Sequence, residues 1–176
     1  ADKAFYQNTT ITSVEIPDSV TSIGYMAFAF CDSLTSVYIT DIAAWCNISF
    51  ADYSANPFYS AKNLYLNNEL VTELVISDSV TEIRPNAFRG CSFTSVVIGG
   101  SVTSIGEEAF AECKSLTGIE VSADNATYQS IDENLYTKDG TTLLQYAIGK
   151  TATSFTIPDS VTSIGDEAFC DCSLTS

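Results

Sequence analysis

The residues from Ile11 to Cys31, ITSVEIPDSVTSIGYMAFAFC, return three more times in this chain with few changes. The copies align without gaps at Val71–Cys91 (VTELVISDSVTEIRPNAFRGC), Phe93–Cys113 (FTSVVIGGSVTSIGEEAFAEC) and Ala152–Cys172 (ATSFTIPDSVTSIGDEAFCDC). Each copy ends with an Ala-Phe pair, two further residues and a cysteine, so the match extends over the whole unit. Self-similarity of this kind indicates an array of stacked structural repeats.

Two further units begin in the same way and then depart from the pattern. Leu34 opens a unit of 37 residues and Leu116 opens one of 36, whereas the other units have 22 or 23 residues. The predicted units begin at residues 11, 34, 71, 93, 116, 152 and 174. We interpret the long units as ordinary coils with insertions at about residues 40–66 and 124–150, within one repeat domain that spans residues 1–176. Neither end carries a polar cap, so we expect a fragment of a longer array.

Alternation of apolar and polar residues predicts the structure of one unit. Residues 13–16 (SVEI) alternate as a half-buried β-strand does, with the apolar side chains on one side. A second alternating run at residues 19–23 (SVTSI) follows the turn signal Pro17-Asp18. Gly24 ends this run, and the next residues suit a short helical turn. Since one unit cannot bury its own apolar residues, we expect parallel strands stacked about 4.8 Å apart, one per coil.

The composition restricts the classes of function. The chain has 22 acidic and seven basic residues, and a formal net charge of −15 repels nucleic acid and anionic lipid. It has no histidine, which removes the usual general base and the commonest zinc ligand. No apolar run is long enough to cross a membrane. We therefore predict no catalytic residue, no cofactor and no metal. A carboxylate-dependent glycan hydrolase is the enzymatic alternative, but Glu15 and Glu120 lie in distant units.

The motif also resembles a known family. The phrase from Ile16 to Gly24 (IPDSVTSIG), followed by Ala27-Phe28 and Cys31, closely resembles the BspA-like class of leucine-rich repeat, and the phrase returns at Ile157–Gly165. The resemblance covers essentially the whole chain, with local departures such as Gly99-Gly100 in place of Pro-Asp and Arg84-Pro85 in place of the glycine step. It implies a leucine-rich-repeat solenoid of the α/β horseshoe class, rich in β-structure.

The same resemblance implies a location and a function. Members of this family are surface or secreted proteins of bacteria, and several adhere to host matrix proteins or to other cells. We therefore expect an extracellular, non-enzymatic adhesion or protein-interaction module, with its signal and anchor outside this fragment. The expected partner is a protein or glycan of a host or neighbouring cell, and the chain itself is expected to be monomeric. A spacer solenoid without a ligand of its own is the structural alternative.

Two residue types recur at fixed places in the units. Leucine-rich repeats use Asn or Cys at the last position, where a small side chain can donate to the backbone of the neighbouring coil. Only Cys91 and Cys113 lie in consecutive coils, and ladder side chains run alongside each other, so we expect free buried thiols. Threonine at the second position is expected to form an inward-facing ladder, with a regular ice-binding array as the alternative. These threonines are Thr12, Thr35, Thr72, Thr94, Thr117, Thr153 and Thr175.

The insertions and the outward strand face contain the candidate ligand contacts. The unit from Leu34 is rich in aromatic residues, and we expect Trp45 and Phe58 inside and Tyr53 and Tyr59 exposed for contact. In the second insertion Asp139-Gly140 predicts a hairpin, and a calcium site among its carboxylates is an alternative that lacks EF-hand spacing. The fifth residue of each coil points outward and supplies the other candidates, with Tyr38, Val75 and Val97 as a modest apolar stripe. The fifth residues are Glu15, Tyr38, Val75, Val97, Glu120 and Thr156, and the first five are the candidate contacts.

Overall fold

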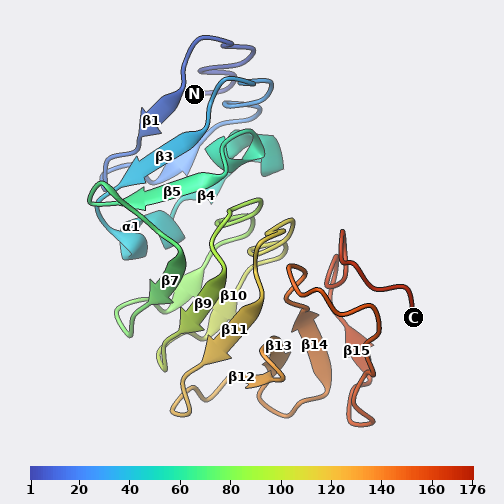
Figure 1. Ribbon diagram of the computed structural model, residues 1–176. Coiled ribbons are helices and arrows are strands. Elements are labelled where there is room, and N and C mark those ends of the chain that lie inside the picture. The colour runs from blue at the N-terminus through green and yellow to red at the C-terminus, as the bar shows by residue number, and fades with distance from the viewer.

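Stacked parallel strands, one per coil, form the main surface of the molecule, as predicted. The computed structural model describes residues 1–176, and Figure 1 shows the strands following one another along the array. The strands of this ladder fall into two sheets rather than one continuous sheet. The first contains β1 (Ser13–Glu15), β3 (Ser36–Ile39) and β5 (Asn63–Leu66), and the second contains β7 (Glu73–Ile76), β9 (Ser95–Ile98) and β11 (Gly118–Val121).

The register of the strands places equivalent positions of successive coils side by side. Val14 lies beside Val37, and Val37 beside Leu64. In the second sheet Leu74, Val96 and Ile119 line up in the same way. A second, shorter ladder completes each coil behind the first. It pairs β2 (Ser22–Ile23) with β4 (Ser49–Phe50), β8 (Glu82–Ile83) with β10 (Ser104–Ile105), and β14 (Thr142–Gln145) with β15 (Ser163–Ile164).

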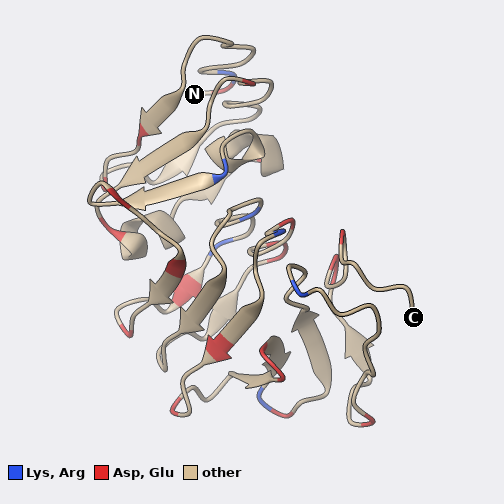
Figure 2. Ribbon diagram, in the orientation of Figure 1, with Lys and Arg blue, Asp and Glu red and all other residues tan.

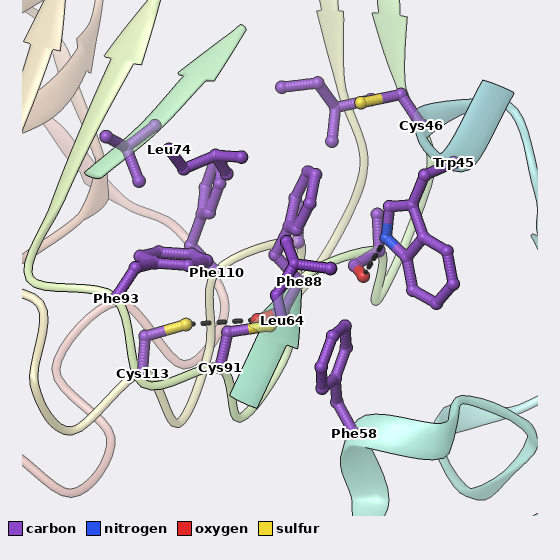
Figure 3. Close-up of a cluster of buried hydrophobic side chains, with 14 of the residues drawn as sticks. Trp45, Cys46, Phe58, Leu64, Leu74, Phe88, Cys91, Phe93, Phe110 and Cys113 are labelled. Carbon is purple, nitrogen blue, oxygen red and sulfur yellow. Dashed lines mark hydrogen bonds between the residues drawn. The ribbon is translucent and has the colours of Figure 1, made fainter. Parts of the chain in front are cut away.

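The core is continuous although the strand ladder is not. One cluster of 34 buried residues extends from Ile16 to Ala147. Phenylalanines of successive Ala-Phe pairs stack in two places. The Phe5 and Phe28 rings have centroids 5.0 Å apart, and the Phe88 and Phe110 rings are nearly parallel with centroids 5.8 Å apart (Figure 3). Because each ring covers its neighbour rather than a partner within its own coil, burial of apolar surface couples the coils to one another.

A tight turn built on left-handed backbone ends each regular coil, that is, each coil with an Ala-Phe pair. Two positions in each of these coils, the residue before the Ala-Phe pair and the residue before the Cys or Asn position, have φ between +53° and +78°. Among these residues only Gly90 is a glycine. The others are Lys3, Gln7, Met26, Phe30, Asn86, Glu108, Glu112, Glu167 and Asp171. Each costs about 1 kcal/mol relative to right-handed backbone, so stacking has to over-determine this turn.

The predictions for the cysteine and the threonine positions have different outcomes. All six cysteines are free, and three of the four in the column are buried as predicted, whereas Cys172 in the last coil is partly exposed. Cys31 donates to the carbonyl of Phe5 at 3.0 Å and Cys113 to that of Phe88 at 3.1 Å. The inward placement of the threonines is wrong, because these residues are exposed. They do form a ladder: the Thr35 hydroxyl and amide both donate to the carbonyl of Thr12, at 3.1 and 2.9 Å. In the coils that have this strand, each threonine lies one residue before the strand begins. It is therefore outside the pleated segment in which alternate side chains point into the core.

The first insertion contains an additional strand of the ladder. Strand β5 pairs in parallel with β3, and a tight turn at Asn67-Asn68 leads back into β6 (Glu69–Leu70). Because β6 occupies the free edge of β5, the sheet ends there and β7 begins a new one. The rest of the insertion forms helix α1 (Ile42–Cys46), capped by Asp41, and the 3₁₀ helices η1 (Tyr53–Ala55) and η2 (Pro57–Tyr59).

Side chains of this insertion join the two sheets. The Trp45 indole donates to the carbonyl of Ala87 at 2.9 Å, and the Asn56 amide donates to the carbonyls of Asn86 and Ala87 at 2.7 and 3.2 Å. Trp45, Asn56 and Phe58 are at most 1% exposed, so Trp45 and Phe58 are inside, as predicted. Figure 3 shows Trp45 and Phe58 beside Phe88 of the following coil.

The second insertion closes the edge of the second sheet. Strands β12 (Tyr128–Ile131), β13 (Asn134–Thr137) and β14 form an antiparallel meander, and Asp139-Gly140 lies in its second turn, as predicted. Ile119 donates its amide to the carbonyl of Glu133 at 2.9 Å, so the free edge of β11 is covered.

The last coil lacks its first strand. One strand per coil predicts a strand around Phe155 beside that of Ile119, and for this coil the prediction is wrong. Residues 152–158 contain no strand, because the meander already occupies the edge of β11. The amide of Phe155 instead donates to the carbonyl of Ser176 at 3.2 Å, and its ring packs on Tyr146 and Phe169.

Replacement of Gly90 should test the left-handed turn. Gly90 has φ +78°, and an added Cβ would lie 3.0 Å from the Phe58 carbonyl oxygen. We expect Gly90→Ala to lower the free energy of unfolding by about 1–2 kcal/mol, measured by urea denaturation. Gly118→Ala is the matched control in β11, where the nearest atom is 3.6 Å away; it should be neutral or stabilising by up to about 1 kcal/mol. Equal effects of both changes would contradict the turn geometry.

Replacement of Asn56 should test the junction between the sheets. Asn56→Ala removes two donors from buried carbonyls and the cap that its Oδ1 provides to the Phe58 amide at 2.9 Å. We expect a loss of about 1–3 kcal/mol of unfolding free energy. Asn47→Ala is the control. It removes an exposed hydrogen bond from the Asn47 side-chain amide to the Ala43 carbonyl, and should lower the free energy of unfolding by about 0.5 kcal/mol or less. A neutral Asn56→Ala variant would show that the junction does not depend on these bonds.

Candidate functional site

The predicted outward residues lie in two separate rows on the strand face. Glu15, Tyr38 and Tyr65 are in register across β1, β3 and β5, and Val75, Val97 and Glu120 are in register across β7, β9 and β11. Val75 is 54% exposed. The predicted continuity of Tyr38 with Val75 and Val97 is wrong, because β5 and the β5–β6 hairpin lie between the two rows.

A groove opens beside the first of these rows. It has a volume of about 370 Å³ and is lined by the end of β1, the end of β3 and the turn between β5 and β6. The Tyr38 and Tyr65 rings stack with centroids 4.6 Å apart and an interplanar angle of 14°, so Tyr65 holds the Tyr38 ring in place from one side. The lining residues are Ser13, Glu15, Tyr38, Ile39, Thr40, Asn67 and Asn68.

A second surface is formed by exposed aromatic rings at the turn edge of the coils. We call it the aromatic stripe, and it consists of Tyr6, Phe30, Tyr59 and Tyr53. The ring centroids of successive members are 5.7, 6.2 and 5.8 Å apart. Phe30 is 43% exposed, Tyr53 52% and Tyr59 38%, so three of the four rings present a large part of their surface to solvent. The stripe connects the first two coils to the first insertion.

Arg89 extends this stripe into the following coils. Its guanidinium lies 5.5 Å from the centre of the Tyr53 ring, and it forms ion pairs with Glu112 at 2.7 Å, with Glu108, and with Glu167 at 3.1 Å. Partial burial opposes the charged form, but the three carboxylates outweigh it and raise the pKa of Arg89. This arginine therefore stays charged and fixed at one end of the stripe.

Tyr53 and Tyr59 were predicted from the sequence, whereas the other members of the stripe were not. A signal for Phe30 was present, because it occupies the position directly before the cysteine, where the other coils have Gly90, Glu112 and Asp171. A large apolar residue in that exposed position is unexplained by the repeat itself. Tyr6 and Arg89 offered no comparable signal.

The charges are distributed unevenly over the elements. Figure 2 shows acidic residues on the strands β1, β7 and β11, whereas every basic residue lies in a loop or turn. No group of three acidic or cysteine side chains is arranged to hold a metal ion. Asp139 of the second insertion instead accepts from Thr137 and Thr141, and these hydrogen bonds lower its pKa. Its geometry is that of a turn residue.

One further pocket, which opens to the surface, has three carboxylates in its lining. It lies between β10 and β14, has a volume of about 180 Å³, and is lined by Glu107, Glu108 and Asp166 over the side chains of Phe110 and Leu144. This volume is below the range of about 300–1,000 Å³ typical of small-molecule sites. Glu108 is also held by Arg89. The other carboxylates considered for hydrolysis, Glu15 and Glu120, lie in different sheets.

The buried thiols are not suited to nucleophilic chemistry. Burial raises the pKa of Cys113 to about 12, and burial together with the charge of Asp41 raises that of Cys46 to about 12. The thiolate, which is the reactive form, is therefore scarce at neutral pH. Cys170 is the exposed thiol and Cys172 is partly exposed.

Alkylation should separate these two classes of thiol. We expect iodoacetamide near neutral pH to modify Cys170 and Cys172 in the folded chain, and Cys46 and Cys113 only on unfolding, because the latter are buried with a raised pKa. Mass spectrometry of the peptides gives the rates. All six thiols should be modified after denaturation without reductant; a smaller number would indicate a disulfide.

Parallel strands stacked from coil to coil, an apolar position inside each of these strands and a Cys or Asn at the turn of each regular coil are the features of a leucine-rich-repeat solenoid. The profile of the BspA type leucine rich repeat region matches in six copies over residues 1–58, 59–145 and 146–176. The chain therefore belongs to this family, as the sequence motif indicated. No curated protein matches the chain.

Solved structures of bacterial proteins share the fold. A leucine-rich repeat protein from Eubacterium ventriosum superposes with a TM-score of 0.63 at 25% identity, covering 95% of this chain and 47% of that one. A leucine rich cell surface protein from Faecalibacterium prausnitzii gives 0.53 at 28% identity, covering 98% and 62%. The pneumococcal vaccine antigen PcpA gives 0.51 at 20% identity, covering 90% and 42%, and supports the fold alone. The chain thus spans less than two thirds of each of these proteins.

Helices have little part in this architecture. The single α-helix, α1, has five residues, and no helix is long and apolar enough to span a membrane.

Proposed function

We propose that the chain is a non-catalytic protein-interaction module of a secreted or cell-surface bacterial adhesin, and that the aromatic stripe is its main contact surface. The observation that carries the proposal is the exposure of Phe30, Tyr53 and Tyr59, which are 38–52% accessible although each contacts another ring. Rings that are exposed and yet held in place add little to the core and are well suited to a partner.

The composition of the stripe matches that of interface hot spots. Aromatic residues and arginine dominate the binding energy of protein interfaces. Here Arg89 lies against Tyr53, at one end of a row of four aromatic rings. Mutual ring contacts and the ion pairs of Arg89 restrict these side chains before a partner arrives. The entropy that binding removes is therefore smaller than for mobile side chains.

The charge of the chain favours a partner with a basic surface. A formal net charge of −15 attracts cationic proteins over distances of about 10 Å at moderate salt and speeds their association. The exposed Val75 and the neighbouring Val97 and Glu120 on the second sheet are secondary candidate contacts, because they provide a smaller apolar area beside a carboxylate.

The relatives support the proposed location. The structure from Faecalibacterium prausnitzii, 28% identical, is a cell surface protein. Enzymatic activity is disfavoured by the lack of histidine, by the raised pKa of the buried thiols and by the small volume of the carboxylate-lined pocket.

A double variant of the stripe tests the proposal. Binding of the purified chain to a panel of immobilised extracellular-matrix proteins is measured by biolayer interferometry. We expect at least one of them to bind the unmodified chain, and Phe30→Ser/Tyr59→Ser to weaken that binding by about 30-fold or more, the effect of losing a hot spot. Added salt should slow association, since the charge of the chain contributes to the encounter.

Tyr25→Ser provides the matched control. Tyr25 is 50% exposed, but none of the aromatic contacts of the stripe involves it, so its removal should leave binding unchanged. Circular dichroism checks that both variants are folded. If no matrix protein binds, or if the double variant binds as well as the unmodified chain, the proposal is wrong, and absence of all binding would favour a spacer.

A further inference from the structure

The groove beside Tyr38 has a chemistry different from that of the aromatic stripe. It combines one aromatic ring with polar side chains from three separate segments: Ser13 and Glu15 of β1, Thr40 after β3, and Asn67-Asn68 of the β5–β6 turn. We propose that this groove binds a neutral saccharide, with Tyr38 as the stacking platform and Glu15, Asn67 and Asn68 as hydrogen-bonding groups.

The arrangement of the two tyrosines provides the platform. Tyr65 covers one face of the Tyr38 ring at 4.6 Å, and Leu70 stands opposite Tyr65 in the hairpin. Tyr38 lines the groove together with Glu15, its partner on the other side in the strand register, whereas Tyr65 does not line it. The remaining ring face is therefore available to the C–H face of a sugar, which buries apolar area against it.

The polar rim is available to a ligand. Thr40 is the only groove residue whose side chain makes a hydrogen bond within the chain, to Asp18 at 2.6 Å. Glu15 offers two acceptor oxygens, and each asparagine offers an acceptor and two donors. Such groups can satisfy adjacent hydroxyls of a sugar ring, which both donate and accept.

The backbone fixes the two asparagines before a ligand arrives. Asn67 and Asn68 have φ of +51° and +68°, as in a two-residue hairpin turn, for which asparagine is well suited. The amide of Asn67 also donates to the carbonyl of Ile39 at 3.0 Å, which ties the turn to the end of β3. A rim that is already ordered lowers the entropic cost of binding.

The charges select against acidic ligands. Glu15 lines the groove, no lysine or arginine does, and the whole chain carries −15. Sulfated, sialylated and uronic-acid-containing glycans would meet repulsion there. The volume of about 370 Å³ falls within the range typical of small-molecule sites. A neutral glycan is the ligand class that fits the ring, the rim and the charge together.

This site does not rest on the proposed protein contact. The groove lies on the strand face and the aromatic stripe on the turn edge, and they share no residue. Loss of one activity is therefore expected to leave the other intact.

Affinity electrophoresis tests the inference with the full chain. One set of native gels contains neutral polysaccharides (glycogen, galactomannan, xyloglucan or mixed-linkage β-glucan), and a second set contains acidic ones (pectate, alginate or heparin). Neutral oligosaccharides released from glycoproteins are tested separately by calorimetry. The two measurements distinguish a polysaccharide ligand from a host-glycan ligand. We expect retardation or binding by at least one neutral ligand and none by the acidic ones. Tyr38→Ala should weaken the dissociation constant for that ligand about tenfold or more.

Further variants keep the result independent of folding. Tyr38→Phe preserves the platform and should bind within about twofold of the unmodified chain. Asn68→Gly removes the amide but tolerates the φ of +68° at this turn, so it should weaken binding several-fold while the chain stays folded by circular dichroism. Tyr53→Ala, in the aromatic stripe, should leave saccharide binding unchanged. Absence of binding to every neutral glycan, equal retardation by acidic ones, or unchanged binding by Tyr38→Ala and Asn68→Gly would overturn the inference.

Discussion

Each coil of this protein can bury its apolar side chains only against the coils on either side, and the remaining structure depends on this constraint. Val37 is fully buried because Val14 and Leu64 stand beside it in register. Where the strand ladder stops after β5, Trp45 and Phe58 pack in the interior between the two sheets, and the core remains one cluster. The strand ladder can therefore be interrupted, provided that apolar side chains keep the core continuous across the interruption.

Much of the fold could be predicted, because periodicity is a local property of the sequence. Alternation around Val14 and Leu74 predicted the strands, and the aromatic insertion predicted a buried Trp45. A strand and a turn can be recognised in residues 64–70, but the parallel pairing of β5 with β3 could not, since residues 61–66 lack the threonine opening and the Pro-Asp turn of the regular coils. The missing strand at Phe155 was inaccessible to local reasoning: its sequence alternates well, but the β12–β13 hairpin had taken the edge that it needed. The exposure of the threonines could not be predicted either, because it depends on the residue at which the pleated strand begins.

The candidate sites, too, could be predicted from the sequence only in part. Glu15 and Tyr38 share a position in the repeat, so their neighbourhood on one face followed from the spacing. That Asn67 and Asn68 complete a groove beside them depends on a hairpin folding back on β5. The stripe brings Phe30 of a regular coil against Tyr59 of an insertion, a meeting set by tertiary packing. Insertions in this solenoid thus create surface chemistry by changing what the regular coils stand next to.

The junction between the two sheets also has a mechanical consequence. Within each sheet, successive coils are joined by continuous rows of backbone hydrogen bonds, whereas across the junction the connection relies on Trp45, Asn56 and isolated backbone bonds such as that from the Arg84 amide to the Cys46 carbonyl. If a tethered cell pulls along the axis of the array, fewer bonds share the tension at this point than elsewhere. The coils before and after it can then part as two intact blocks, so the solenoid can lengthen stepwise under load.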